Sequence, residues 1–137
     1  MTPAGMAEIH AAAFTTQRPW TEQEIKDLLN ASTTFSVEVN DHSFAIGQAV
    51  AGEAELLTIA TDPNFQRQGH GRTCLKKFIS LAKSNNAGTI FLEVYENNAV
   101  AIALYEDAGF KAVSRRKAYY KLPNGARSDA IQMVLTC

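Results

Sequence analysis

The segment Gln66-Arg67-Gln68-Gly69-His70-Gly71-Arg72 constrains the fold of this 137-residue chain most strongly. It leads into a helical pattern and follows an apolar run made of Leu56, Leu57 and Ile59. Gly69 and Gly71 allow a tight turn and a close backbone approach to a ligand, because they have no Cβ. Free N–H groups at the start of the following helix carry the positive end of its dipole. The segment therefore predicts either a phosphate site or an ordinary strand-to-helix turn.

Two common phosphate-binding loops do not fit this segment. The dinucleotide fingerprint requires a third glycine where Cys74 stands, and a Walker loop ends in Gly-Lys-Ser/Thr. The segment fits Gln/Arg-x-x-Gly-x-Gly/Ala instead, read as Gln66-x-x-Gly69-x-Gly71. In this form it resembles the acyl-CoA pyrophosphate loop of the GNAT N-acetyltransferases.

The resemblance extends over roughly residues 55 to 135, and this part of the chain looks like the RimI type of ribosomal-protein alanine N-acetyltransferase. It is carried by Ile59-Ala60-Thr61-Asp62-Pro63, Phe91-Leu92-Glu93-Val94, Asn98 with Ala101-Ile102-Ala103-Leu104-Tyr105-Glu106, Gly109-Phe110, Arg115-Arg116 and Tyr119-Tyr120. The resemblance implies an α/β (α+β) fold with a mixed, mostly antiparallel central sheet, a splayed parallel strand pair and about four flanking helices. The strand that usually precedes the first helix in this family is expected to be short or absent here.

Hydrophobic spacing and turn residues predict the order of the elements. A first helix is expected at 4–14, and a second runs from a Thr21/Glu24 capping box to about Asn30. A third follows the glycine loop and buries a stripe made of Cys74, Leu75, Phe78, Ile79 and Ala82. A fourth begins at Asn97 or Asn98 and ends at Gly109. The last helix is expected to bury Val100, Ala101, Leu104 and Ala108. Strands are expected at 34–39, 43–50, 53–61, 89–95, 110–120 and 126–135, with a final turn at Pro123-Asn124-Gly125.

Length and composition predict one domain, residues 1–137, with a single core. The two cysteines indicate no disulfide framework and suit a reducing compartment. The first residues lack a secretory signal pattern, and no apolar run approaches the roughly 20 residues of a membrane span. We therefore expect a soluble, cytoplasmic protein without a membrane partner.

The two parts of the chain differ in charge. Residues 1–62 hold nine acidic and two basic residues, whereas residues 63–137 hold five acidic and eleven basic residues. The basic part suits the phosphates of coenzyme A, and the acidic part suits a cationic acceptor such as an amine or a basic peptide, although a solvated surface also explains this pattern. Nucleic-acid binding is not favoured, because the basic residues are spread over several elements and the net charge is −1.

Acyl transfer from a thioester to an amine needs a bound acyl-CoA, a neutral amine and a proton donor for the departing thiolate. By resemblance, the backbone of Ile59 to Thr61 pairs with the pantetheine arm and the glycine loop holds the pyrophosphate. The alternative is that Ile59 is a core strand residue and the arginines are solvated. The expected acetyl-CoA-binding residues are Ile59, Ala60, Thr61, Arg67, Gln68, Gly69, His70, Gly71, Arg72 and Asn98.

Glu93 and Tyr105 are the expected catalytic residues. Glu93 stands among Phe91, Leu92 and Val94, where an uncompensated carboxylate is costly to bury and tends toward a raised pKa, as a general base requires. The alternative is an ion-paired or solvated carboxylate. Tyr105 lies at the border of the apolar helical stripe, and the matched family position protonates the CoA thiolate. The alternative is a packed aromatic ring.

Three aromatic residues are candidates for the acceptor groove: Trp20, Tyr119 and Tyr120. Each also fits packing in the core or across strands. Cys74 is expected to be inert on a buried helical stripe. His10, His42 and His70 show no metal-ligand spacing, so no metal is implied.

The sequence thus favours an acetyl-CoA-dependent N-acetyltransferase acting directly on the N-terminal α-amino group of a protein, for which the resemblance suggests the alanine of a small-subunit ribosomal protein. A small-amine N-acetyltransferase is one alternative. A non-catalytic acyl-CoA-binding module is another, since a fold can hold this cofactor without turning it over.

Overall fold

The computed structural model describes residues 1–14, 18–122 and 124–137. The elements follow one another as α1 (Pro3–Ala13), α2 (Glu22–Leu29), β1 (Thr34–Val39), β2 (Ser43–Val50), β3 (Glu53–Thr61), the 3₁₀ helix η1 (Pro63–Phe65), α3 (His70–Ser84), β4 (Thr89–Tyr95), α4 (Ala99–Asp107), β5 (Lys111–Lys121) and β6 (Arg127–Thr136). The described residues before α1 form no strand, as expected. Pro123 of the predicted final turn lies outside the described residues.

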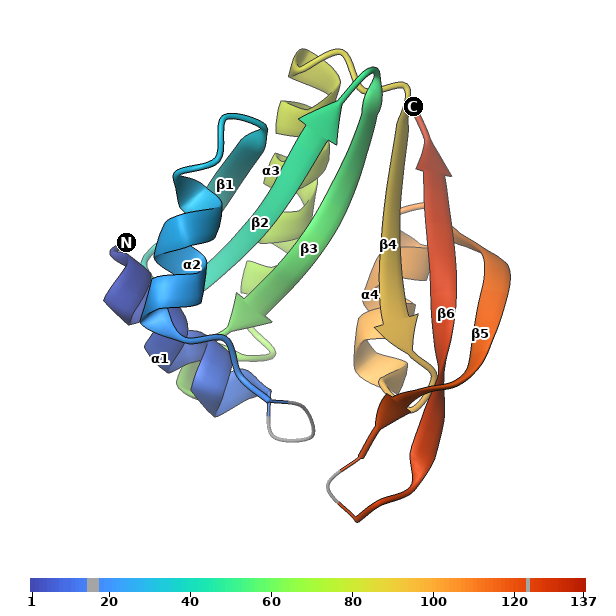
Figure 1. Cartoon of the computed structure of the whole chain (residues 1–137). Helices are drawn as coiled ribbons and strands as arrows, with labels where there is room; N and C mark the ends of the chain where they lie inside the picture. The colour runs from blue at the N-terminus through green and yellow to red at the C-terminus, as the bar shows by residue number, and fades with distance from the viewer. Residues whose placement is uncertain (15–17, 123) are drawn as a thin grey trace.

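The six strands form one sheet in the order β1-β2-β3-β4-β6-β5. Neighbouring strands are antiparallel except for β3 and β4, whose parallel pairing covers only Glu53–Glu55 and Thr89–Phe91. Beyond these residues the two strands diverge, as Figure 1 shows. The predicted mixed sheet with a splayed parallel pair is confirmed.

A β-bulge in β3 lies where this divergence begins. Ile46 of β2 pairs with Thr58, but Gly47 pairs with Leu56, so Leu57 is the extra residue. An extra residue reverses the alternation of side chains between the two faces of a strand. Leu56 accordingly belongs to the core under α3, whereas Ala60 belongs to the core under α1 and α2.

Helices cover both faces of the β1–β3 half of the sheet. In Figure 1, α1 and α2 lie in front of this half, α3 lies behind it, and α4 lies behind β4. The stripe predicted for α3 packs as expected, with Cys74, Leu75, Phe78 and Ala82 buried. None of the helices in the described ranges is long and apolar enough to cross a membrane.

Local sequence explains the start of α2. The Thr21 side chain accepts from the Glu24 N–H at 3.1 Å, and the Glu24 carboxylate accepts from the Thr21 N–H at 3.1 Å. This is the predicted capping box. Arg18 adds a two-pronged ion pair to Glu24, at 2.7 and 2.9 Å. Below the cap, Ile25 is completely buried against α1 and the sheet.

The prediction for the apolar face of α4 is partly wrong. Val100 is 84% exposed, while Tyr105 is buried and Ala101 and Leu104 pack against the core. Successive helical residues are 100° apart, so Val100 lies to one side of the row formed by Ala101, Tyr105 and Ala108. Asn98 caps the helix by accepting from the Ala101 N–H at 3.2 Å.

Candidate active site

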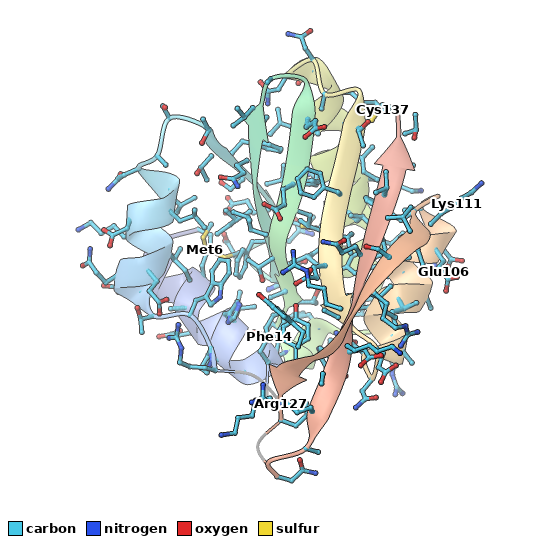
Figure 2. The ribbon with its side chains drawn as sticks, turned by 45° about the vertical axis from the view of Figure 1, so that its right-hand side comes forward. Met6, Phe14, Glu106, Lys111, Arg127 and Cys137 are labelled. Atoms are coloured by element: carbon cyan, nitrogen blue, oxygen red, sulfur yellow. The ribbon has the colours of Figure 1, made fainter. Side chains whose placement is uncertain are left out.

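A cavity of about 990 Å³ lies between the diverging strands β3 and β4. Its walls come from α1 and the residues before α2, from the second half of β3, from the segment between η1 and α3, and from β4, α4 and the end of β5. In Figure 2, Phe14 at the end of α1 and Arg127 at the start of β6 lie toward the same end of the molecule, opposite Cys137. The residues that line the cavity are far apart in sequence, from His10 of α1 to Lys121 of β5.

The β3 wall presents an unpaired strand edge. In the described part of the chain, β3 pairs with β4 only through Glu53–Glu55, although it pairs with β2 along most of its length. Ile59, Ala60 and Thr61 line the cavity beyond that point. Their backbone groups can pair with an extended ligand in the way that an added strand does.

The glycine loop forms a second wall next to the start of α3. Gly69 is the N-cap of α3, with φ +81° and no side-chain cap, and the first turn contains no acidic residue. Arg67 also adopts a left-handed backbone, with φ +63°. A Cβ on Gly69 would meet nothing within 4 Å, so the backbone conformation rather than lack of space requires glycine here. The uncapped N–H groups of this helix start can receive an anion.

The residues of the loop differ in whether they line the cavity. Arg67, His70, Gly71 and Arg72 line the cavity, but Gln68 does not. Arg72 forms an ion pair of 3.1 Å with Asp107 at the end of α4, and both side chains are 59% exposed. The pair links the loop to α4 at the edge of the cavity. Asn98, the α4 cap, also lines it.

Glu93 lies in the β4 wall and is not the uncompensated carboxylate that the sequence suggested. Arg116 Nε of β5 is 3.2 Å from Glu93 Oε2, and the Glu93 side chain is 22% exposed. Gln132 Nε2 donates to the same oxygen at 3.4 Å. A charged partner from β5 therefore offsets the cost of holding this carboxylate beside an apolar strand.

Tyr105 of α4 lines the cavity and packs edge-on against Phe110, with ring centroids 6.0 Å apart. Burial and, to a lesser degree, the nearby Tyr120 raise the pKa of the Tyr105 hydroxyl above its usual value of 10. Burial, with Glu93 as a further cause, raises the pKa of Tyr120 to about 12. Both phenols are therefore protonated at neutral pH and can act as hydrogen-bond donors.

On the α1 side, the cavity wall is an aromatic stack centred on His10. Its ring lies between those of Phe14 and Trp20, with centroid distances of 4.2 and 5.2 Å, and its Nδ1 accepts from the backbone N–H of Trp20 at 3.1 Å. Burial lowers the pKa of His10 to about 4, which keeps the imidazole neutral. All three rings line the cavity, so Trp20 belongs both to the core and to the cavity wall. The sequence prediction overlooked His10, although its spacing of four from Phe14 indicates two rings on one helical face.

Tyr119 and Tyr120, the two predicted acceptor-groove residues at the end of β5, differ in position. Tyr120 lines the cavity and makes an edge contact with Tyr95 at 5.9 Å. Tyr119 lies outside the described cavity wall, half exposed, with its ring under the Arg116 guanidinium at 5.1 Å. Cys74 lies on the buried face of α3, and burial raises the pKa of its thiol to about 11, so the prediction of an inert thiol fits its position.

Comparison with known proteins identifies the family. The profile of the Acetyltransferase (GNAT) family matches residues 4–110. This chain belongs to the GNAT family. The splayed strands and the glycine loop thus form the cavity of a GNAT domain, as the resemblance in the sequence implied.

Three relatives of this GNAT chain have informative names. The [Ribosomal protein bS18]-alanine N-acetyltransferase of Escherichia coli K12 is 47% identical over 93 residues, which cover 68% of this chain and 62% of the relative. The protein of the same name from Haemophilus ducreyi is 34% identical over 120 residues, covering 85% and 83%. The crystal structure of the Escherichia coli ribosomal-protein-S18-alanine N-acetyltransferase superposes with a TM-score of 0.87 at 36% identity, covering 98% of this chain and 86% of the other.

Proposed function

We propose that this chain transfers the acetyl group of acetyl-CoA directly to the N-terminal α-amino group of a protein. One observation carries the proposal: a single cavity is lined by the glycine loop, the unpaired edge of β3, the carboxylate of Glu93 and the protonated phenol of Tyr105. Acetyl transfer to an amine needs a group of each of these kinds.

Acetyl-CoA fits the two walls made by β3 and the loop. The pyrophosphate lies at the uncapped start of α3, where N–H groups and the helix dipole favour an anion. The pantetheine arm pairs with the free backbone edge at Ile59–Thr61 as an added strand. Arg67 supplies further positive charge, and Arg72 does so if its ion pair with Asp107 opens.

Glu93 and Tyr105 have complementary roles in proton transfer. Glu93 takes a proton from the ammonium form of the acceptor, directly or through one water, and the neutral amine attacks the thioester carbonyl. As the C–S bond breaks, the thiolate of CoA receives the proton of the Tyr105 hydroxyl, which solvent then restores. The Tyr105 hydroxyl is protonated at neutral pH, so its proton is in place when sulfur departs.

The acceptor is an α-amine rather than a lysine side chain. An α-amino group has a pKa of about 7.7–8.0 and lysine one of about 10.4, so the neutral fractions near pH 7 differ roughly 400-fold, or about 3.5 kcal/mol. The amine with the smaller deprotonation cost therefore reacts faster.

The terminal alanine of a small-subunit ribosomal protein is the acceptor that the relatives support. The Escherichia coli and Haemophilus ducreyi proteins are both named for ribosomal protein bS18 alanine. The aromatic wall of His10, Phe14 and Trp20 gives the cavity an apolar surface for a short side chain. We accordingly propose that the reaction takes place in the cytoplasm.

Two peptides of one sequence test the proposal. The first has a free N-terminal alanine and a blocked lysine, and the second has a blocked terminus and a free lysine. We expect the first to be acetylated faster, and Glu93→Gln to lose most of this activity at pH 7 and to recover part of it as the pH rises toward the amine pKa. Faster acetylation of the lysine peptide would contradict the α-amine assignment, and a variant pH profile parallel to the parent's would contradict the role of Glu93.

A further inference from the structure

We propose that Ser114 and Gln132 are positioning residues that fix the carboxylate of Glu93 in its reactive orientation. This inference rests on the role of Glu93 in the proposed function. It adds two polar residues, on β5 and β6, that the sequence motifs do not single out. Neither residue lines the cavity, so both act through Glu93 and not on the substrates.

The three side chains lie in one row across three neighbouring strands. Glu93 of β4 is directly opposite Gln132 of β6, and Gln132 is directly opposite Ser114 of β5. Directly opposed residues in antiparallel strands project from the same face of the sheet. The row reaches Ser114 only because β5 contains a bulge between Ala112 and Ser114. Val113 is the extra residue; if β5 paired regularly instead, Val113 would stand opposite Gln132, and its side chain could make no hydrogen bond.

The hydroxyl of Ser114 anchors the end of the Gln132 amide that faces away from Glu93. Ser114 Oγ donates to Gln132 Oε1 in a short hydrogen bond, and Gln132 Nε2 donates to Glu93 Oε2 at 3.4 Å. If the amide were reversed, its oxygen would face the carboxylate and two acceptors would oppose each other. The Glu93 carboxylate, which can only accept, therefore selects this amide orientation, and the Ser114 hydroxyl holds the opposite end of the amide in place.

Arg116 completes the support from the same side. Its Nε lies 3.2 Å from Glu93 Oε2, the oxygen that Gln132 also contacts, and its guanidinium lies 5.1 Å above the Tyr119 ring. Among the described residues, Glu93 Oε1 has no hydrogen-bond or ion-pair partner. With Oε2 held by Gln132 and Arg116, the group cannot rotate freely, and Oε1 is the oxygen available to the acceptor amine.

The location of the row indicates that it contributes little to folding. β5 is one of the two edge strands of the sheet, and every residue from Lys111 to Tyr119, Ser114 included, is exposed. Side chains at such positions change stability little when they are replaced. A loss of turnover without loss of stability would therefore indicate positioning of Glu93 rather than a structural role.

The test uses the full chain with acetyl-CoA and the free-terminus peptide. Ser114→Ala and Gln132→Met should each lower kcat about fivefold, the order expected for one lost hydrogen bond of ordinary strength, with an unchanged KM for acetyl-CoA. Ser114→Thr keeps the hydroxyl and should restore the parent rate. Val113→Ala on the neighbouring bulge residue is the matched control and should behave as the parent does.

Combined variants separate positioning from other effects. Ser114→Ala added to Gln132→Met should cause no further loss, because the hydroxyl acts only through the amide. Both substitutions should also be silent in a Glu93→Gln background. Parent-like kcat in Ser114→Ala and Gln132→Met, or an equal loss in the Glu93→Gln background, would overturn the positioning role. Full activity of Glu93→Gln by itself would instead overturn the proposed base, so the two failures are distinguishable.

Discussion

Replacing His10 by phenylalanine should make the protein less sensitive to acid. His10 is 3% exposed, lies between the rings of Phe14 and Trp20, and has its pKa lowered by burial from 6.5 to about 4. Between these two values the unfolded chain binds a proton at this residue and the folded chain does not. The stability that the neutral imidazole provides is thus fully present above pH 6.5 and is lost as the pH falls toward 4.

The pKa shift sets the size of the effect. For a group that titrates at 6.5 when unfolded and at about 4 when folded, lowering the pH from 7.5 to 4.5 removes about 2.5 kcal/mol of unfolding free energy. His10→Phe cannot titrate, so its own loss over this range should be smaller than the parent's by that amount. The variant also loses the acceptor for the Trp20 N–H, but this cost is the same at both pH values.

Urea unfolding followed by far-ultraviolet circular dichroism at pH 7.5 and 4.5 measures the difference. His10→Asn, which can keep an acceptor near the Trp20 N–H, is the matched variant and should show the same reduced pH dependence as His10→Phe. Parent and variants that lose stability in parallel, within about 0.5 kcal/mol, would refute the assignment of a buried neutral imidazole.

Three further predictions concern the cavity and the core. Gly69→Val should weaken acetyl-CoA binding in calorimetric titration far more than Arg67→Ala does, because a β-branched residue resists the φ of +81° that presents the N–H groups. Equal losses would indicate that side-chain charge dominates. Tyr105→Phe should lower single-turnover acetylation on the order of 10²-fold with acetyl-CoA affinity nearly unchanged, and an unchanged rate would remove Tyr105 from the mechanism. Iodoacetamide should label exposed Cys137 in the native protein at pH 8 and Cys74 only in urea, since Cys74 is buried with a thiol pKa of about 11; rapid native labelling of Cys74 would contradict this.

Much of the fold could be predicted because its signals are local. The Thr21/Glu24 capping box, the ends of the strands at 34–39, 43–50, 53–61 and 89–95, and the buried stripe of α3 all depend on residues a few positions apart. The glycine loop is equally local, since the left-handed backbone at Gly69 and the uncapped start of α3 follow from the residues of the loop itself. The loop motif and its surroundings were enough to indicate the family.

Other properties of the site depend on residues that only folding brings together. The Leu57 bulge lies where β3 and β4 begin to diverge, and it is recognised only from the residues that pair with Ile46 and Gly47 of β2. Glu93 was expected to lack a charge partner, yet Arg116 reaches it from a strand that is not even adjacent to β4.

The sequence by itself therefore determined the elements, the glycine loop at the start of α3 and the presence of a carboxylate and a phenol. Tertiary structure decided how these groups behave. In the folded chain Tyr105 is buried, whereas Val100 of the same helix is exposed. His10 lies between two aromatic rings, and Ser114 and Gln132 lie in one row with Glu93. The physical reason is that hydrogen-bonding patterns within a helix turn or a tight loop involve near neighbours, whereas desolvation and ion pairing depend on every group that the folded chain places within a few ångströms.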